Sequence, residues 1–213
     1  MGDSITSLLR KASIVFWDFD GVIKDSVGIK SDAFEKLFSI YGSKLAKKVR
    51  AHHELNGGMS RFKKIPLYLE WAGETQTAQL VEAYCEKFAN LVVQAVIDSP
   101  WVPGVREYLL DNFSSQRFVL ITATPQEEIE SILAALNISH CFQDVYGAPM
   151  EKDKAVASVL KRCSIQAQDA LVVGDSTSDL HAANMNKVPF LLRSTPLNEM
   201  MRERFVGVTF ISL

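Results

Sequence analysis

The sequence predicts an α/β fold in which a parallel sheet is covered by helices and interrupted by an all-helical insertion. Three short apolar runs lack strict alternation, as strands buried on both faces do, and lie at 13–17, 117–121 and 170–173. Each run is followed by small or polar residues and then by a helical pattern. This repeated order favours parallel strands joined by right-handed crossovers. Further strands are expected at 144–146 and 189–192, with an edge strand at 208–212.

The insertion is predicted from the spacing of the first two strands. Residues 18–116 separate them, far more than the dozen or so that a simple crossover needs. The intervening chain predicts helices at 31–40, 43–50, 60–71 and 76–96, and Pro66 is expected to kink or split the third. The Pro- and Gly-containing stretch 99–104 ends the pattern before another helix at 105–110. We therefore predict an α/β domain from residues 1–25 and 100–213, and a helical domain from residues 26–99.

Composition restricts the classes of function. With 213 residues, 47% of them hydrophobic, the chain can bury roughly 70% of its unfolded surface in a core. The net charge of −2 argues against a nucleic-acid partner. The three cysteines, Cys85, Cys141 and Cys163, form no CxxC pair, which argues against a zinc site and for a reducing compartment. Without a signal-peptide pattern or a run of roughly 20 apolar residues, we expect a cytoplasmic monomer or homodimer with no membrane partner.

Two carboxylates follow the first predicted strand. Asp18 and Asp20 are two residues apart, so in an extended segment their side chains face the same way, and Gly21 permits an unusual backbone geometry. Ligands of parallel α/β sheets bind at the carboxyl ends of the strands. There, one carboxylate can act as a nucleophile and the other as a general acid and then base. The alternative is a turn with solvated acids.

A second acidic pair follows the strand at 170–173. Asp175 and Asp179 are four residues apart and share one face if the segment is helical. Together with Asp18 and Asp20 they predict an all-oxygen cluster that suits Mg²⁺. A lone pair of this kind is also typical of helix capping, but two acidic strand ends in one chain favour a metal site.

Hydroxyl and ammonium groups complete the predicted phosphate site. Thr122 lies at the tip of the second strand, where its hydroxyl and backbone N–H groups such as that of Ala123 could hold phosphate oxygens. Thr124 is expected to be the N-cap of the next helix, with Pro125 at its first position. A lysine from the segment 152–154, just before or within a helix expected at 153–162, could supply a cation. The alternative for this lysine is a solvated loop position.

These motifs resemble the haloacid dehalogenase-like hydrolase superfamily. The resemblance rests on Asp18-Phe-Asp20-Gly21-Val22, Thr122 after an apolar strand, a lysine at 152 or 154, and Gly174-Asp175-Ser-Thr-Ser-Asp179. They occur in the family's order, and the match covers essentially the whole chain. The resemblance implies a Rossmann-like core with a helical cap inserted after the first motif, where the insertion is predicted.

The resemblance also implies roles for these residues. Asp18 would form an aspartyl-phosphate, and Asp20 would protonate the leaving group and then activate water, its backbone carbonyl also touching Mg²⁺. Thr122 and a lysine would bind the phosphoryl group, while Asp175 and Asp179 would hold the metal. Lys152 follows Gly147-Ala-Pro149 at a spacing found in relatives and is preferred, with Lys154 as the alternative.

Asp20 favours phosphoryl transfer over dehalogenation, because the dehalogenases of this superfamily lack an acid at that position. With Asp20 present, Lys63 and Lys64 are interpreted as a charged helix face rather than as the Schiff-base lysine of a phosphonatase. We therefore predict a Mg²⁺-dependent phosphatase acting on a small phosphorylated metabolite, such as a sugar phosphate or a phosphoglycolate-like ester. The alternatives are a phosphomutase of the β-phosphoglucomutase type and a protein of this fold that binds a ligand without turnover.

Substrate choice is expected to depend on the loop at 52–62. In relatives the corresponding loop reaches over the core site, so Gly58 and Arg61 are candidate substrate-binding residues. Arg61 could bind a second anionic group of the substrate through a bidentate contact; the alternative is a surface arginine. Ser60 is expected to cap the following helix. His52 and His53 lack the spacing of a metal site and are interpreted as polar residues of the helical domain.

Overall fold

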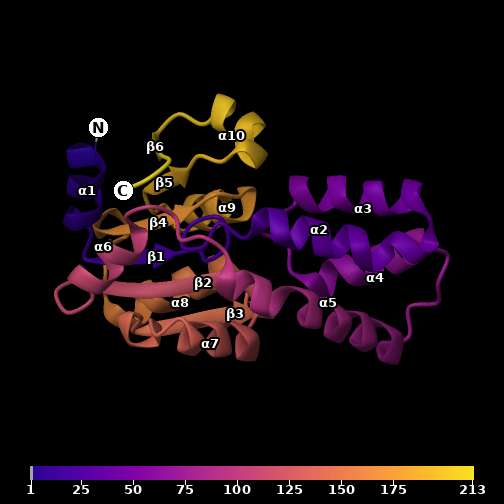
Figure 1. The fold of residues 1–213 in the computed structure, drawn as a ribbon. Coiled ribbons are helices and arrows are strands. Elements are labelled where there is room, and N and C mark those ends of the chain that lie inside the picture. Colours follow the sequence, from indigo (N-terminus) through magenta and orange to yellow (C-terminus); the bar gives the residue numbers. More distant parts are fainter. Residues whose placement is uncertain (1) are drawn as a thin grey trace.

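The computed structural model describes residues 2–213 and contains a six-stranded parallel sheet of order β3-β2-β1-β4-β5-β6 (Figure 1). The strands are β1 (Ile14–Trp17), β2 (Arg117–Pro125), β3 (Asp144–Ala148), β4 (Ala170–Gly174), β5 (Phe190–Arg193) and β6 (Val208–Phe210). Each predicted strand is present, including the edge strand, and β2 continues to Pro125, beyond its predicted end. The predicted α/β fold with a parallel sheet is confirmed.

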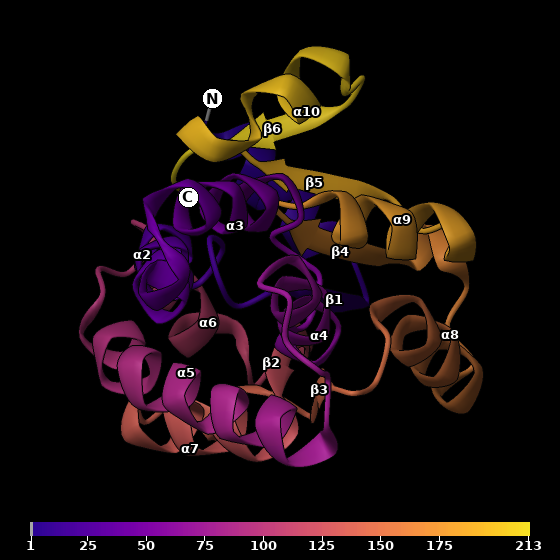
Figure 2. The ribbon, with the colours of Figure 1, turned by 90° about the vertical axis from the view of Figure 1, so that its right-hand side faces the viewer.

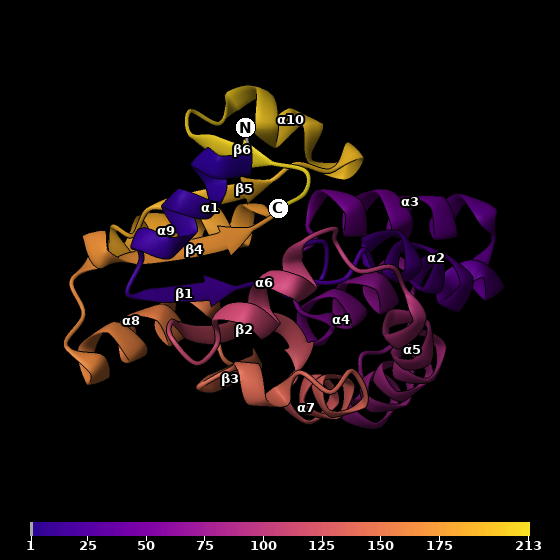
Figure 3. The ribbon, with the colours of Figure 1, turned by 60° about the vertical axis from the view of Figure 1, so that its left-hand side comes forward.

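Helices cover both faces of the sheet, which explains the continuous apolar runs. Val15 and Trp17 of β1 belong to one buried cluster, to which α1 (Gly2–Lys11), α6 (Val105–Asn112) and α7 (Gln126–Ala135) contribute. Ile14 and Phe16 point to the opposite face, against α8 (Lys152–Cys163) and α9 (Thr177–Asn186). Figure 3 shows α1 beside the sheet. The sequence patterns did not predict α1, which buries Leu9 in the first cluster.

Four helices between β1 and β2 form a separate bundle at one end of the sheet (Figures 1 and 2). They are α2 (Val27–Phe38), α3 (Ser43–Leu55), α4 (Arg61–Trp71) and α5 (Ala78–Asp98), with a 3-10 turn at Ser39–Tyr41 after α2. We call α2 to α5 the helical unit. Ser60 caps α4, accepting from the backbone N–H of Phe62 at 3.2 Å, as predicted. Pro66 lies inside α4 without splitting it.

The helical unit has an aromatic interior. The rings of Phe34 and Phe88 lie 4.0 Å apart between centroids, and Tyr68 packs edge-on against both Phe34 and Phe38. Phe34 and Phe38 are four residues apart and therefore lie on one face of α2, which is turned toward Tyr68 of α4 and Phe88 of α5.

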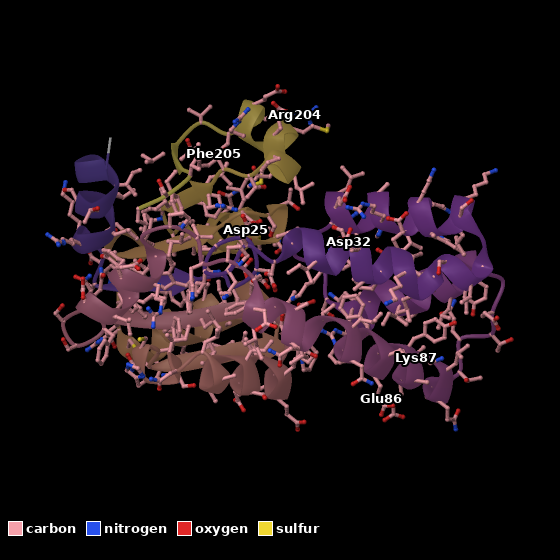
Figure 4. The ribbon with its side chains drawn as sticks, in the orientation of Figure 1. Asp25, Asp32, Glu86, Lys87, Arg204 and Phe205 are labelled. Atoms are coloured by element: carbon pink, nitrogen blue, oxygen red, sulfur yellow. The ribbon has the colours of Figure 1, made fainter. Side chains whose placement is uncertain are left out.

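The C-terminal segment passes over the sheet edge and reaches α3. It contains a 3-10 turn at Pro196–Asn198 and α10 (Glu199–Arg204), which precede β6. The turn contacts α3, and the side-chain amide of Asn198 donates to the backbone carbonyls of Asp175 and Arg193, at 2.8 Å each. Figure 4 shows Arg204 and Phe205 at the end of α10, and Asp25 where the chain leaves the sheet for α2. The remaining 3-10 turns are Ser139–Cys141 and Ala167–Asp169.

None of the helices formed by residues 2–213 is both long enough and apolar enough to cross a membrane.

Candidate functional site

Three carboxylates meet where β1 and β4 end. These strands are neighbours in register, with Trp17 opposite Val173, so Asp18 and the loop after Gly174 leave the sheet together. One carboxylate oxygen from each of Asp18, Asp175 and Asp179 lies within 4.8 Å of the others. The close approach requires a glycine at position 21, because a Cβ there would lie 2.1 Å from Oδ2 of Asp175 and φ is +77°.

Lys152 is the lysine that reaches this cluster. Its Nζ lies 2.9 Å from Oδ1 of Asp18 and 2.6 Å from Oδ1 of Asp179. Burial alone would lower the pKa of Lys152, but the two carboxylates raise it above its ordinary value. Lys154 is exposed and pairs with Glu151 at 2.7 Å. Of the two candidate lysines, the structure therefore brings Lys152 to the acids and leaves Lys154 at the surface.

Asp179 has two functions in the local fold. Its Oδ2 accepts from the backbone N–H of Ser176 at 3.2 Å, and the Ser176 side chain accepts from the backbone of Asp179, which together form a capping box at the start of α9. The same Oδ2 also accepts from the hydroxyl of Ser176 at 2.5 Å. Its Oδ1 binds Lys152. The side chain is fully buried, so both the helix start and the lysine depend on it.

The buried charges fit a divalent cation. Burial, and then the charge of Asp179, raises the pKa of Asp18 to about 7. Burial and Asp18 together raise the pKa of Asp175 well above its ordinary value. Three carboxylates thus face one lysine, an excess of negative charge that a cation would relieve. Since the donor atoms are all carboxylate oxygens, the residues Asp18, Asp175 and Asp179 fit Mg²⁺.

The carboxylate of Asp20 is held apart from this group. Its Oδ2 lies 2.5 Å from Nζ of Lys30 and accepts from the hydroxyl of Thr124 at 3.2 Å, while its Oδ1 accepts from the hydroxyl of Ser26 at 2.6 Å. Burial alone would raise the pKa of Asp20, but Lys30 and the hydroxyls lower it below the ordinary value. Asp20 therefore lies beside Asp18 in the chain but has its own set of partners.

Thr124 corrects one sequence-based expectation. It is not the N-cap of the next helix, because α7 begins at Gln126 with Pro125 before it, and Thr124 remains in β2. Its hydroxyl accepts from Lys30 at 2.9 Å and donates to Asp20. The strand extends past Thr122, whose buried hydroxyl accepts from the backbone N–H of Thr124 at 3.2 Å.

A cavity of about 590 Å³ lies between the strand ends and the helical unit. The predicted site residues that line it are Asp18, Asp20, Gly58, Arg61, Thr122, Ala123, Lys152 and Asp175. Asp179 is fully buried and does not line the cavity. The segment from Thr195 to Val206 contributes a further wall, including the labelled Arg204 and Phe205 (Figure 4).

Gly58 brings the loop before α4 into contact with the start of α9. A Cβ at Gly58 would lie 1.8 Å from the hydroxyl oxygen of Ser178 and 2.6 Å from that of Ser176. The absence of a side chain therefore permits the helical unit to approach the core at the predicted loop.

Arg61 is buried and paired. Its guanidinium makes a bidentate contact with Glu128 of α7, at 2.9 and 2.5 Å, and the residue is 6% exposed. The alternative interpretation of a surface arginine is therefore wrong. The contact joins α4 to a helix of the core. It also pairs the guanidinium of Arg61, which was expected to bind a second anionic group of the substrate, with a carboxylate of the protein.

Lys64 and His53 form a polar pair that the sequence reasoning missed. Lys64 is 1% exposed, and its Nζ lies 2.7 Å from Nδ1 of His53, which is 3% exposed. Both line the cavity. The expected charged helix face is correct for Lys63, which is exposed and pairs with Glu151, but wrong for Lys64. The burial of Lys64 could have been predicted from its spacing. Lys64 lies three residues after Arg61 and four before Tyr68, so the three side chains share the buried face of α4.

Burial affects the charge of this pair. Burial, and then the charge of Lys30, lowers the pKa of Lys64 to about 7. Burial and Lys64 lower the pKa of His53 well below its ordinary value, so the imidazole is neutral. His52 lies outside the pair and its Nδ1 is 2.9 Å from the hydroxyl of Tyr68.

Known proteins resemble this chain over most of its length. The phosphoglycolate phosphatase of Photorhabdus laumondii is 27% identical over 191 residues, which are 86% of this chain and 81% of that protein. Phosphoglycolate phosphatase 1 of Pseudomonas aeruginosa is 25% identical over 184 residues, or 82% of this chain. The match covers 66% of the Pseudomonas protein, so the chain spans slightly less than two thirds of it.

Solved structures share the fold. The β-phosphoglucomutase of Clostridium difficile matches with a TM-score of 0.74 at 20% identity, over 94% of this chain and 91% of that one. CbbY of Rhodobacter sphaeroides, solved with xylulose-(1,5)bisphosphate, matches with a TM-score of 0.73 at 13% identity, over 94% of each chain. The family model described as haloacid dehalogenase-like hydrolase matches residues 15–192. The chain therefore belongs to the haloacid dehalogenase-like hydrolases, which confirms the predicted family.

Proposed function

We propose that the protein is a Mg²⁺-dependent phosphatase that hydrolyses a small phosphate monoester through an aspartyl-phosphate on Asp18. The observation that carries the proposal is the placement of the buried Asp18 beside Lys152 and Thr122, with a second acid, Asp20, lining the same cavity. The similarity to phosphoglycolate phosphatases supports the reaction class. The helical unit, from the predicted insertion 26–99, would act as the cap that closes over the substrate.

The nucleophile is oriented before substrate arrives. The backbone N–H of Phe19 donates to Oδ1 of Asp18 at 2.8 Å, and Lys152 contacts the same oxygen at 2.9 Å. A phosphoryl group attacked by Asp18 would place its oxygens near the ammonium of Lys152 and the hydroxyl of Thr122. When bound to Asp18, Asp175 and Asp179, Mg²⁺ would neutralise charge on these oxygens. The aspartyl-phosphate formed on Asp18 is then hydrolysed by water.

Asp20 would transfer the protons. In the first half-reaction a protonated Asp20 gives its proton to the leaving oxygen, and in the second its carboxylate takes a proton from the attacking water. Lys30 and the hydroxyl partners favour the ionised form of Asp20, which is the form required for the second half-reaction. Entry of the leaving oxygen beside Asp20 would replace part of this hydrogen-bonding set.

The Asp18→Asn variant tests the nucleophile. We expect turnover of a generic aryl phosphate to fall by about 10³-fold or more, because an amide cannot form the covalent ester. The matched control is Asp25→Asn, which changes an exposed acid close by in the chain. Wild-type turnover by folded Asp18→Asn enzyme would refute the proposed nucleophile, and full activity after exhaustive chelation would refute the requirement for Mg²⁺.

A phosphomutase is the second candidate. The cavity of about 590 Å³ exceeds what a two-carbon ester fills, and a mutase would use the same core residues. Phosphorus NMR of a reaction with a hexose monophosphate separates the two activities, because hydrolysis releases inorganic phosphate whereas a mutase yields an isomeric ester. The site favours catalysis over binding without turnover, since every predicted core acid is present in one cluster or beside it.

A further inference from the structure

The wall that the helical unit contributes to the cavity carries a buried cation that the proposed chemistry does not use. Lys64 projects from α4, and it lines the cavity together with His53 of α3 and Phe34 of α2. We propose that Lys64, held by His53, binds a carboxylate on the leaving portion of the substrate, so that the preferred substrates are phosphate monoesters that also carry a carboxylate. This inference rests on the proposed phosphatase function and names its substrate class.

The charge balance of the cavity supports a ligand at Lys64. Three other buried or half-buried cations that line the cavity have acid partners: Lys30 pairs with Asp20, Arg61 with Glu128, and Lys152 with Asp18 and Asp179. Among the residues whose side chains the structure describes, Lys64 pairs with no carboxylate; its hydrogen-bond partner is the neutral imidazole of His53. A protonated lysine buried in this way costs several kcal/mol unless an anion accompanies it.

The amount of charge indicates which anion fits. When protonated, Lys64 supplies one positive charge that no ion pair among the described residues balances, whereas Lys30 and Arg61 are already paired with their acids. One uncompensated charge matches a carboxylate, which carries a single negative charge near neutral pH. A second phosphate would bring almost two negative charges and would leave one of them buried without a partner.

The hydrogen-bond donors also match a carboxylate. The ammonium of Lys64 has three N–H groups, and His53 Nδ1 accepts one of them at 2.7 Å. When Lys64 is protonated it can only donate, so Nδ1 accepts and the neutral imidazole carries its proton on Nε2, a buried nitrogen that has no partner among the described residues. The remaining N–H groups of Lys64 are available to the two oxygens of a carboxylate, and the unpaired Nε2–H shows that the hydrogen bonding of this wall is incomplete.

The apolar surroundings would strengthen such a contact. Phe34 and Phe88 are buried and line the same part of the helical unit, and the Phe34 ring lies 5.7 Å from Nζ of Lys64. A contact between opposite charges gains energy as water is excluded from around it. Arg61, which was expected to bind a second anionic group, is held by Glu128. The structure therefore favours Lys64 for the role that the sequence suggested for Arg61.

The test compares two esters that differ in one charge. One is 2-phosphoglycolate. The other is phosphoglycolamide, which keeps the phosphate but has an uncharged amide in place of the carboxylate. We expect the wild type to prefer the carboxylate, and Lys64→Met to reduce the ratio of the two kcat/KM values by about 10- to 100-fold, the effect of losing one charged hydrogen bond. Lys63→Met is the matched control, since Lys63 is next to Lys64 in the chain but its side chain is exposed and pairs with Glu151. We expect Lys63→Met to retain the wild-type ratio.

A direct binding measurement separates this inference from the proposed reaction. Calorimetry with the Asp18→Asn variant reports binding of both esters without turnover, and adding Lys64→Met should weaken binding of 2-phosphoglycolate by a similar factor. Lys64→Gln, which keeps a polar group, replaces Lys64→Met if circular dichroism shows that the methionine variant is unfolded.

The outcomes are distinct. If 2-phosphoglycolate binds through Lys64 but wild-type enzyme releases no phosphate from either ester, the phosphatase function is wrong and the carboxylate site stands. If wild-type enzyme hydrolyses both esters with equal kcat/KM and neither Lys64 variant changes the ratio, the carboxylate site is wrong and the phosphatase function stands.

Discussion

Single residues determine the protonation states in this cavity. Lys30 lies against Asp20 and is the main cause of its lowered pKa, acting against the effect of burial. Lys64 is the opposite case, because its burial is not balanced by an acid and its pKa falls to about 7. The consequences for rate and for stability can be measured separately.

Removing Lys30 should change the pH dependence of the reaction. Without its ammonium the pKa of Asp20 rises, since burial then acts with only the hydroxyl groups opposing it. We expect the limb of the kcat/KM profile that reports ionisation of Asp20 to move to higher pH in Lys30→Met. Lys36→Met, an exposed lysine on the same helix, is the control. An unshifted limb would show that Lys30 does not govern Asp20.

Removing Lys64 should stabilise the free protein. The folded pKa of about 7 lies below the ordinary 10.5, so the unfolded chain binds the extra proton between these values and wild-type stability rises with pH across that window. The cost of burying Lys64 is therefore fully present below pH 7. We expect Lys64→Met to raise Tm by several degrees at pH 6 and by much less at pH 10. Lys63→Met is the reference, and an equal gain at both pH values would contradict the shift.

At the scale of elements, two of the contacts between the helical unit and the core bear directly on the cavity. The ion pair of Arg61 and Glu128 joins α4 to α7, and the backbone at Gly58 lies against Ser178 in α9. The first contact is buried and charged, and the second depends on the absence of a side chain. One fixes the helical unit over the cavity, and the other sets how closely its loop approaches the core.

Breaking the ion pair should destabilise the fold. Glu128→Gln leaves the guanidinium of Arg61 buried without its counter-charge, which costs about 3–5 kcal/mol of unfolding free energy. Glu127→Gln provides the control, because this neighbouring acid is exposed in the same helical turn. Urea unfolding of both variants measures the difference. Equal small losses would show that the pair contributes little.

A side chain at position 58 should separate the loop from the core. The added Cβ of Gly58→Ala would overlap the hydroxyls of Ser178 and Ser176 and also Cβ of Ser178, so the loop and the start of α9 cannot keep their present separation. We expect kcat/KM to fall by roughly tenfold or more, because small misplacements at an active site are costly. Gly57→Ala is the matched control, since an added Cβ at Gly57 would meet no atom within 4 Å. Equal activities of the two variants would exclude a role for this close contact.

At the scale of the whole molecule, the acidic cluster couples folding to metal binding. Burial, and after it the charges of the neighbouring aspartates, raises the pKa values of Asp18 and Asp175, so the folded state holds their carboxylates ionised at a cost. A cation that binds the folded state and not the unfolded chain stabilises the whole protein. The effect should therefore appear as a change in global stability as well as in activity.

Metal binding is tested by thermal unfolding with and without Mg²⁺. We expect saturating Mg²⁺ to raise Tm by a few degrees relative to EDTA, because at about 100 times Kd the gain is near 2.7 kcal/mol. The Asp175→Asn variant should lose this shift, since it removes a predicted ligand and part of the repulsion. A metal-dependent Tm shift of wild-type size in that variant would show that Asp175 is not a metal ligand.

Much of the fold and part of the site follow from local sequence patterns. Apolar runs predicted the strands, and the acids after 13–17 and 170–173 predicted the cluster, because parallel neighbouring strands end at the same edge of a sheet. Helix α1 and the C-terminal α10 were missed, although α1 is amphipathic and its apolar face, which carries Leu9, could have been recognised from the sequence. The helical unit was predicted from spacing and period alone.

By itself the sequence determined the family, the sheet and the acids at its edge, because short-range patterns and motif order encode these features. Only the tertiary structure decided between Lys152 and Lys154, placed Thr124 beside Asp20, and committed Arg61 to Glu128. It also showed Lys64 buried against His53. The physical reason is common to these cases. The partner and the solvation of a charged side chain depend on elements distant in the sequence, and packing brings those elements together.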